Sequence, residues 1–337
     1  MLKVFYSNAL ISSPVDNHAT DTLLGALYFS QQTLTDISDF DAASTFAHVA
    51  MPGLGGQSAL YEFFQSTDQS QAGQSDQLHF RFNDNILFGV ITLNESEFSG
   101  DPGSTPLQAA SKTAYEKIFA MLKAQNFPYV LRFWNYIADI NGISHDLERY
   151  RQFNLGRQQA FIGNDQHIAG NVPAACALGT TGGPLMVAFL AGRTPTLAIE
   201  NPRQISAYDY PAEYGPRSPL FSRASMASVA GNSMLFLSGT ASIVGHQTLH
   251  AGDVSAQTEE SIENIAAVLD EADRKTATKF NMTDLHYIVY IRDPAHFPQV
   301  RAILEHRIGP HVKASYVQAD ICRSDLLVEI EGSAELQ

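Results

Sequence analysis

The sequence predicts an α+β protein of two domains with one architecture, each a mixed sheet with helices packed on one face. The chain has 337 residues, which is too long for one small core and suits two domains of ordinary size. Its hydrophobic fraction of 45% and charged fraction of 17% are typical of a globular protein with a sizeable core. Apolar periodicity gives the order strand, helix, strand, helix, strand, strand in each half of the chain.

The first copy of this order begins near residue 79. The earlier residues show little pattern, and residues 65–77 form a polar, low-complexity stretch that we expect to be a loop. Thr105 can cap a helix whose first position suits Pro106, and Tyr115 and Phe119 share its apolar face. The expected strands are 79–82, 86–93, 129–136, 174–178 and 185–190, and the expected helices are 106–125 and 147–161.

The second half repeats the order with different residues. Asp293-Pro294 opens its second helix and Gly309-Pro310 closes it. The stretch 196–230, rich in Pro, Tyr, Arg and Ser, would connect the halves. The expected strands are 234–238, 285–291, 314–319 and 326–330, and the expected helices are 256–272 and 294–308. We therefore expect an N-terminal domain at 1–195 with an extra leading segment, a linker at 196–230 and a C-terminal domain at 231–337.

The charge balance excludes some partners. The formal net charge is −14, so we do not expect a nucleic-acid partner, which would call for a basic face. A small anionic ligand stays compatible, because a local cationic pocket can lie within an acidic protein. No lysine occurs between Lys123 and Lys275, whereas arginines are frequent there, and an arginine fork binds a carboxylate at two points. Surface ion pairs explain the same bias about as well.

Cysteine and histidine usage gives no sign of a metal. The two cysteines, Cys176 and Cys322, do not form a CxxC pair, so neither zinc nor disulfides are expected. His246 and His250 have a spacing that could serve a metal on a helix, but the glycines around them favour a loop. The first residues lack the apolar core of a signal peptide, and no apolar run reaches the about 18 residues of a membrane span. We expect a cytoplasmic protein with no membrane partner.

The helix at 147–161 carries an unusual stripe of side chains. Helical spacing places Tyr150, Asn154, Arg157 and Phe161 on one face. A cation, an amide and aromatic rings together suit an aromatic acid better than a plain core does. An ordinary helix whose arginines extend to water explains the pattern about equally well.

Two further segments are rich in functional groups. The segment 200–224 combines three tyrosines and three arginines with prolines, as binding loops commonly do, although a simple interdomain linker fits it too. In the segment 322–332, Glu329 and Glu331 alternate with apolar residues. A strand with one face toward water is the ordinary explanation of that alternation.

Together these segments resemble the chorismatase family over roughly residues 78–332. The closest similarity is to the bacterial subgroup that forms 3-hydroxybenzoate and 4-hydroxybenzoate. The C-terminal half also resembles the Rid/YjgF family, through Ser238-Gly-Thr, the helix from Gln257 and Val328-Glu-Ile-Glu. The resemblance implies two Rid/YjgF-like, chorismate mutase-like domains and a homotrimer. The motifs are Asn135-Tyr-Ile-Ala-Asp-Ile-Asn, Glu148-Arg-Tyr-Arg-Gln-Phe-Asn, Gly156-Arg-Gln-Gln-Ala-Phe, Tyr208-Asp-Tyr-Pro, Tyr214-Gly-Pro-Arg-Ser-Pro-Leu-Phe-Ser-Arg, Phe236-Leu-Ser-Gly-Thr-Ala-Ser and Cys322 to Gly332.

The resemblance also implies roles for individual residues. Glu329 matches the family's general acid, and Cys322 matches the position associated with hydroxybenzoate formation. Arg157 and Arg223 match ligands of the substrate carboxylates. The implied substrate-binding set is Arg157, Arg223, Tyr210, Tyr214, Arg217, Phe153 and Ala241. No metal and no cofactor are implied.

The activity expected on this basis is cleavage of chorismate to pyruvate and 3-hydroxybenzoate, 4-hydroxybenzoate or both. The acid must carry a proton near neutral pH, whereas a free glutamate titrates at about 4.3. Burial and the two nearby carboxylates of the substrate would each raise the pKa of Glu329. One alternative is a hydrolytic chorismatase that releases a dihydroxycyclohexadiene carboxylate, which Cys322 disfavours. Another is a Rid-like imine deaminase or ligand-binding protein, which has no need of the loop at 208–223.

Overall fold

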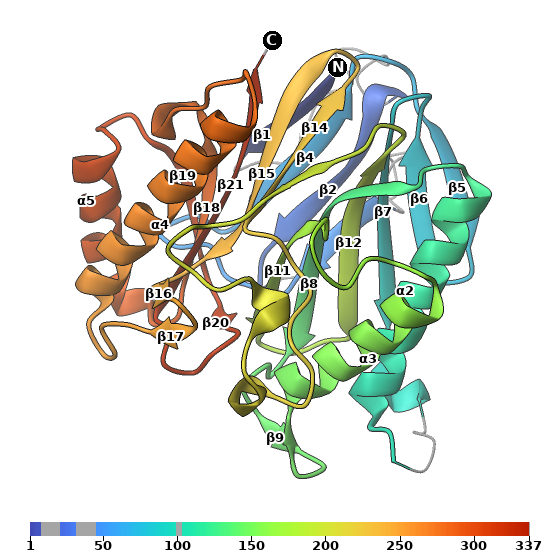
Figure 1. Cartoon of the computed structure of the whole chain (residues 1–337), viewed down its shortest axis with the longest axis horizontal. Coiled ribbons are helices and arrows are strands. Elements are labelled where there is room, and N and C mark those ends of the chain that lie inside the picture. Colours follow the sequence, from blue (N-terminus) through green and yellow to red (C-terminus); the bar gives the residue numbers. More distant parts are fainter. Residues whose placement is uncertain (8–20, 32–44, 99–102, 337) are drawn as a thin grey trace.

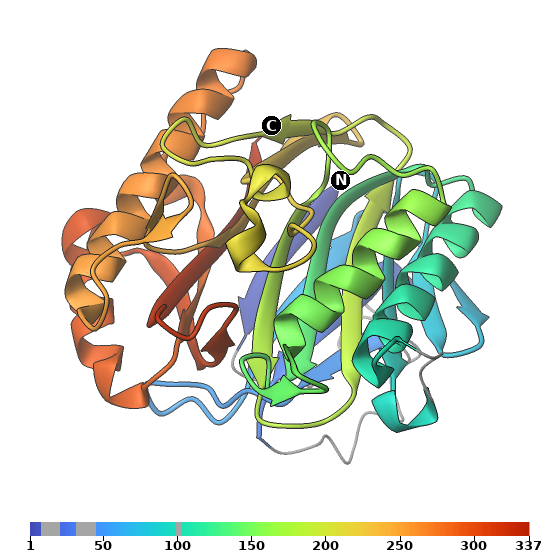
Figure 2. The same cartoon turned by 60° about the horizontal axis from the view of Figure 1, so that its bottom comes forward.

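The computed structural model describes residues 1–7, 21–31, 45–98 and 103–336. Three sheets of seven, six and four strands form the centre of the molecule, and the long helices lie outside them. In Figures 1 and 2, α4 and α5 flank one side of the strands and α2 and α3 flank the other. No helix among the described residues is long and apolar enough to cross a membrane.

The N-terminal unit consists of the seven-stranded sheet and two helices, in the strand order β20-β11-β8-β12-β7-β6-β5. As predicted, the Thr105 side chain caps α2 by accepting a hydrogen bond from the backbone N–H of Gln108, at 3.2 Å. The elements are β5 Gln71–Ser75, β6 Leu78–Phe82, β7 Ile86–Leu93, α2 Pro106–Ala124, β8 Tyr129–Ala138, α3 Arg149–Gly163, β11 Ala174–Thr180, β12 Leu185–Gly192 and β20 Asp320–Ile321.

The C-terminal unit consists of the six-stranded sheet, in the strand order β13-β14-β15-β21-β18-β19, and two helices. Asp253 caps α4 through the backbone N–H of Ala256, at 3.0 Å. The elements are β13 Leu197–Ile199, β14 Ala224–Val229, β15 Asn232–Thr240, α4 Val254–Lys275, β18 His286–Ile291, α5 Phe297–Arg307, β19 Lys313–Gln318 and β21 Val328–Leu336.

The two units share one topology, which confirms the predicted fold class. In each unit a hairpin leads to a helix, a strand, a second helix, a parallel strand and a returning strand. The order β6-β7-β12-β8-β11 in the first unit corresponds to β14-β15-β21-β18-β19 in the second. The pairs β8/β11 and β18/β19 are parallel, and the other pairs in these two series are antiparallel.

The third sheet, for which the sequence analysis made no prediction, completes the core. It has the order β1-β4-β2-β3 and consists of β1 Leu2–Ser7, β2 Leu23–Phe29, β3 Phe46–Val49 and β4 Leu60–Ser66. Its apolar side chains share one buried cluster with the helix-free faces of the two large sheets, as Phe64, Trp134 and Phe236 illustrate. Each large sheet therefore has helices on one face and the common core on the other.

Strands also occur inside two ranges predicted as loop or linker. Within 196–230, β13 and β14 pair in the C-terminal sheet, and β14 runs antiparallel to β15. Within 65–77, β5 pairs with β6. The strands β5 and β14 consist mainly of small or polar residues, and Val229 is the only β-branched or aromatic residue in the two, so they lack the composition that usually marks a strand.

Candidate active site

A cavity of about 300 Å³ lies where the two units meet. Its wall combines the start of α3, the loop that follows β13, and the C-terminal unit around β15 and β21. The volume is near the lower end of ordinary ligand cavities and suits a molecule with one ring. Most of the predicted site residues line it, namely Tyr210, Tyr214, Arg223, Ala241, Cys322 and Glu329.

Glu329 is held on the inner face of β21. Val328 and Ile330 face α4 in the helix-side core, so strand alternation turns Glu329 the other way, toward the cavity. The side chain is only 4% exposed. Burial, reinforced by the charge of Glu331 and opposed by that of Arg132, raises the pKa of Glu329 to about 8. The carboxyl is therefore mostly protonated at neutral pH, as a general acid must be.

Gly239 makes room for this carboxyl. The pairing of β15 with β21 shifts register between Leu237 and Thr240, which places an irregularity of the sheet beside Glu329. A Cβ atom at position 239 would collide with Glu329 Oε1. Gly239 was not predicted as a site residue, although the Ser238-Gly-Thr motif contains it.

Cys322 lies at the seam between the units. It directly follows β20, which pairs with β11 and so joins a C-terminal segment to the N-terminal sheet. The half-buried thiol lines the same cavity as Glu329. Burial and the charge of Glu329 raise the pKa of Cys322 to about 12, against a lowering by Arg323. Cys322 is therefore a neutral thiol at physiological pH and not a thiolate nucleophile.

Arg223 and Arg323 supply the cavity with positive charge. Arg223 Nη2 donates to Tyr210 Oη at 2.9 Å and to the Ile205 carbonyl at 2.7 Å. The Arg323 guanidinium lies 4.0 Å from the ring centroid of Tyr214. Arg223 Nε and Arg323 Nη2 are both buried without a hydrogen-bond partner among the described residues. Such unbonded N–H groups are costly unless a ligand accepts from them, and a carboxylate does so well.

Arg323 is a site residue that the sequence analysis did not select. Its position next to Cys322, within the segment 322–332, was the available signal. Arg323 Nη1 donates to the His246 carbonyl at 2.8 Å, which ties the segment to the hairpin of β16 Ile243–Val244 and β17 Gln247–Thr248. His246 and His250 thus belong to a hairpin and its following turn, in agreement with the loop expected there.

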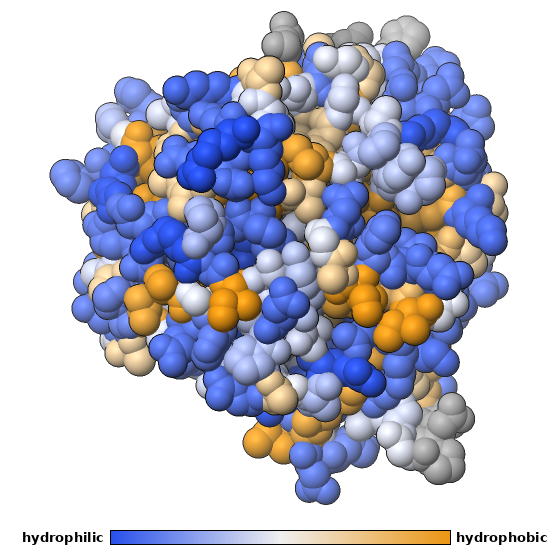
Figure 3. All heavy atoms as spheres, in the orientation of Figure 1, coloured by the Kyte–Doolittle hydropathy of each residue, from blue (hydrophilic) through white to orange (hydrophobic). Residues whose placement is uncertain are grey.

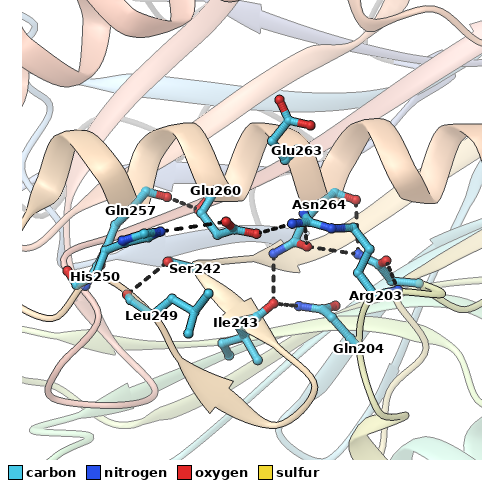
Figure 4. Close-up of polar contacts among 12 residues, drawn as sticks. Arg203, Gln204, Ser242, Ile243, Leu249, His250, Gln257, Glu260, Glu263 and Asn264 are labelled. Carbon is cyan, nitrogen blue, oxygen red and sulfur yellow. Dashed lines mark hydrogen bonds and ion pairs between the residues drawn. The ribbon is translucent and has the colours of Figure 1, made fainter.

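Asn264 of α4 holds two walls of the cavity together (Figure 4). Its amide donates to the carbonyls of Ala241 at 3.0 Å and Ile243 at 2.9 Å. Its side-chain oxygen accepts from Arg203 Nη1 at 2.8 Å, and Arg203 Nη2 lies 2.6 Å from Glu260 Oε1. Asn264 has no exposed surface, so these bonds fix the loop after β13 against the turn that carries Ala241.

Three predicted substrate ligands do not line the cavity. Arg157 is 2% exposed and lies 5.1 Å from the ring centroid of Tyr115 and 5.3 Å from that of Phe161. Phe153 is fully buried in the same aromatic cluster, and Arg217 is exposed on the loop. The stripe predicted on α3 does exist, but it faces the sheet of its own unit, and only its first residue, Tyr150, reaches the cavity. Direct substrate binding by these three residues stays a prediction.

Comparisons with known families cover both halves of the chain. Residues 62–191 match the family described as "Chorismatase FkbO/Hyg5-like, N-terminal". Residues 221–336 match the family described as "Endoribonuclease L-PSP". The boundary between the two matches falls in the loop that lines the cavity, so each unit of the structure corresponds to one match.

Relatives of known name extend along most of the chain. A "Chorismatase" of Streptomyces hygroscopicus is 33% identical over 324 residues, which is 94% of this chain and 90% of the relative. A "3-hydroxybenzoate synthase" of the same organism is 37% identical over 262 residues, covering 72% of this chain and 76% of the relative. A crystal structure titled as a chorismatase superposes with a TM-score of 0.85 and 29% identity, covering 99% of this chain and 98% of the other. The chain belongs to the chorismatase family.

Proposed function

We propose that this enzyme cleaves chorismate and releases pyruvate together with 3-hydroxybenzoate, 4-hydroxybenzoate or both. The observation that carries the proposal is the buried carboxyl of Glu329, whose pKa is raised, in a cavity that also holds two arginines with unbonded N–H groups. Chorismate has two carboxylates and an acid-sensitive enol ether, which are the groups that such a cavity can bind and protonate.

The first chemical step is proton transfer from Glu329 to the terminal methylene carbon of the enol ether. The carbon next to the ether oxygen becomes cationic. The bond between that oxygen and ring C3 then breaks, its electron pair stays with the oxygen, and pyruvate departs. The two products together contain all the atoms of chorismate, so the reaction needs neither water nor a redox partner.

The fate of the ring decides the aromatic product. If the C4 hydroxyl oxygen attacks C3 as pyruvate leaves, its proton is lost and an epoxide forms. Opening of the C4–O bond, with protonation of the oxygen that stays on C3 and loss of the C3 hydrogen, then gives 3-hydroxybenzoate. Loss of the C4 hydrogen without epoxide formation gives 4-hydroxybenzoate instead. In both routes one proton is returned to the Glu329 carboxylate, which closes the cycle.

Cys322 is the residue that we assign to proton movement at the ring. It shares the cavity with Glu329, and its raised pKa keeps it a neutral S–H group that does not compete as a nucleophile. The relative named as a 3-hydroxybenzoate synthase supports an aromatic product. Arg223 and Arg323 are the proposed carboxylate ligands, with charged hydrogen bonds worth about 1.5–3 kcal/mol each.

The test is incubation of the purified protein with chorismate. Pyruvate is followed with lactate dehydrogenase, and the ring product is identified by chromatography against authentic standards. Pyruvate with an equal amount of hydroxybenzoate supports the proposal. Pyruvate with a dihydroxycyclohexadiene carboxylate assigns the hydrolytic reaction instead. Absence of pyruvate, together with turnover of an imine, would place the protein with the Rid-like deaminases. The homotrimer implied by the family resemblance stays a prediction.

A further inference from the structure

A buried network of charged and phenolic groups lies where the three sheets meet, outside the cavity. Glu331 of β21 forms an ion pair with Arg132 of β8, and Tyr290 of β18 donates to Glu331 Oε1 at 2.6 Å. Glu62 of β4 accepts from Tyr6 at 2.9 Å. Both carboxylates and Arg132 are at most 3% exposed. The proposed chemistry uses none of these groups, yet burying them is expensive.

The network touches the acid through β21. Glu329 and Glu331 are two positions apart on one strand, so both side chains leave the same face with a separation of about 6.6 Å along the strand. Tyr290 is the residue of β18 that pairs with Glu329 in register, and its hydroxyl reaches across to Glu331. The ion pair with Arg132 and this hydroxyl hold Glu331 as an anion in a fixed place behind the acid.

Several other groups contribute to the field at Glu329. Arg132 lowers its pKa, but by less than burial and Glu331 raise it. The Arg132 guanidinium donates hydrogen bonds to Glu331 and to the Leu237 carbonyl. Its positive charge is therefore partly balanced within the network. Other titratable or charged groups near Glu329 come from α3 and the residue before it, β11, the loop after β13 and the segment after β20. They are Tyr150, Cys176, Glu148, Arg151, Tyr210, Tyr214, Arg223, Cys322, Arg323 and Asp325.

We propose that Glu331 is a positioning residue for catalysis, whose anion, fixed by Arg132 and Tyr290, keeps the neighbouring Glu329 in its proton-bearing form. This inference rests on the proposed function, because it matters only if Glu329 is the acid. The direction of the pKa shift at Glu329 supports it. It also explains why the sheet tolerates a buried ion pair that apolar side chains could replace.

The experiment measures the titration of Glu329 in Glu331→Gln. Without the anion, we expect the midpoint to fall by about one unit or more, since a charge at this separation is worth roughly that much in a partly screened interior. The pH midpoint of the alkaline fall in kcat decreases by the same amount, so kcat at pH 8 falls about fivefold. The protonated-carboxyl band in the infrared spectrum, assigned by its loss in Glu329→Gln, gives the midpoint without substrate.

The matched control is Glu62→Gln. It removes another buried carboxyl from the same network, but Glu62 is not among the groups that shift the pKa of Glu329. The midpoint of Glu329 should stay within a few tenths of a unit of wild type in this control. Equal midpoints in wild type, Glu331→Gln and Glu62→Gln would overturn the inference. A merely structural role for Glu331 would lower yield or melting temperature without moving the midpoint.

A second variant covers the case in which Glu331→Gln does not fold. Replacing both partners, in Glu331→Gln with Arg132→Met, avoids an unpaired buried cation. The charge of Glu331 outweighs that of Arg132 at Glu329, so the midpoint still falls, by less than in the single variant. A rise or no change contradicts the inference. The infrared midpoint tests Glu331 even if the protein shows no activity on chorismate, so failure of the proposed function remains distinguishable.

Discussion

The two units have the same strand order but very different central strands. In the N-terminal unit the returning strand is β12, an entirely buried run of apolar and small residues. The corresponding strand of the C-terminal unit, β21, carries Glu329 and Glu331 at equally buried positions. One unit therefore has an ordinary core strand where the other has the proposed acid and a second buried carboxylate beside it.

Under the proposed function, the chemistry depends on a few side chains placed on a repeated scaffold. The N-terminal unit contributes a wall at the start of α3. Its strand β11 pairs with β20, which directly precedes Cys322. The C-terminal unit contributes the proposed acid Glu329, the thiol of Cys322 and the guanidinium of Arg323. Figure 3 shows a face on which polar residues predominate and apolar ones form small scattered groups.

The largest effect is expected from Glu329→Gln. The amide keeps the shape of the side chain but cannot donate an acidic proton, so kcat should fall by about 10³-fold while the substrate Kd changes little. Pyruvate release and equilibrium binding measure the two quantities. Near-normal turnover in this variant would show that the acid has been misassigned.

The next effect contrasts two glycines, one in each unit. Gly239→Ala forces the Glu329 carboxyl away, so we expect a loss in kcat of about 10²-fold, as for a misplacement of about 1 Å. Gly89 of β7 instead contacts the Phe189 ring, where alanine overpacks the core and should cost about 1–3 kcal/mol of stability. Kinetics and thermal unfolding should separate the two variants. Equal loss of kcat in both would remove the contrast between the units.

Arginine substitutions test which cations bind the substrate. Arg223→Ala and Arg323→Ala should each raise KM by roughly 10–100-fold, the value of a charged hydrogen bond. Arg217→Ala should change KM less than about twofold, because Arg217 is exposed. Arg157→Ala should lower the melting temperature through lost packing against its aromatic neighbours. A larger KM effect at Arg157 than at Arg323 would reverse the assignment.

A smaller effect concerns stability and pH. The pKa of Glu329 is raised in the folded state, to about 8, so the folded protein binds this proton more tightly than the unfolded chain does. The contribution of Glu329 to the free energy of unfolding is therefore greatest below the ordinary glutamate pKa and is lost as the pH rises toward 8. Relative to wild type, the free energy of unfolding of Glu329→Gln should rise by a few kcal/mol at most between pH 5 and pH 8. Chemical denaturation at both pH values measures the difference.

Most elements beyond residue 78 could be predicted from the sequence, because each buries one face and so repeats apolar residues at the spacing of a helix or a strand. The third sheet could not, since β2 is buried on both faces and lacks the alternation that marks a half-exposed strand. Residues of the site were harder to predict. Strand alternation alone predicts that the Glu329 side chain faces water. The side chain is buried because the three sheets pack together on that face. Helical spacing predicted that Arg157 lies on a stripe of α3, but it could not predict which way that stripe faces.

The proposed mechanism requires Glu329 to be a neutral carboxylic acid at physiological pH. An infrared titration of the wild-type enzyme, with Glu329→Gln as the subtraction reference, measures this directly. The structure predicts a protonated-carboxyl band that disappears with a midpoint near pH 8. A midpoint near the ordinary glutamate value of about 4.3 would leave the cavity without a proton donor at this position and would contradict the mechanism.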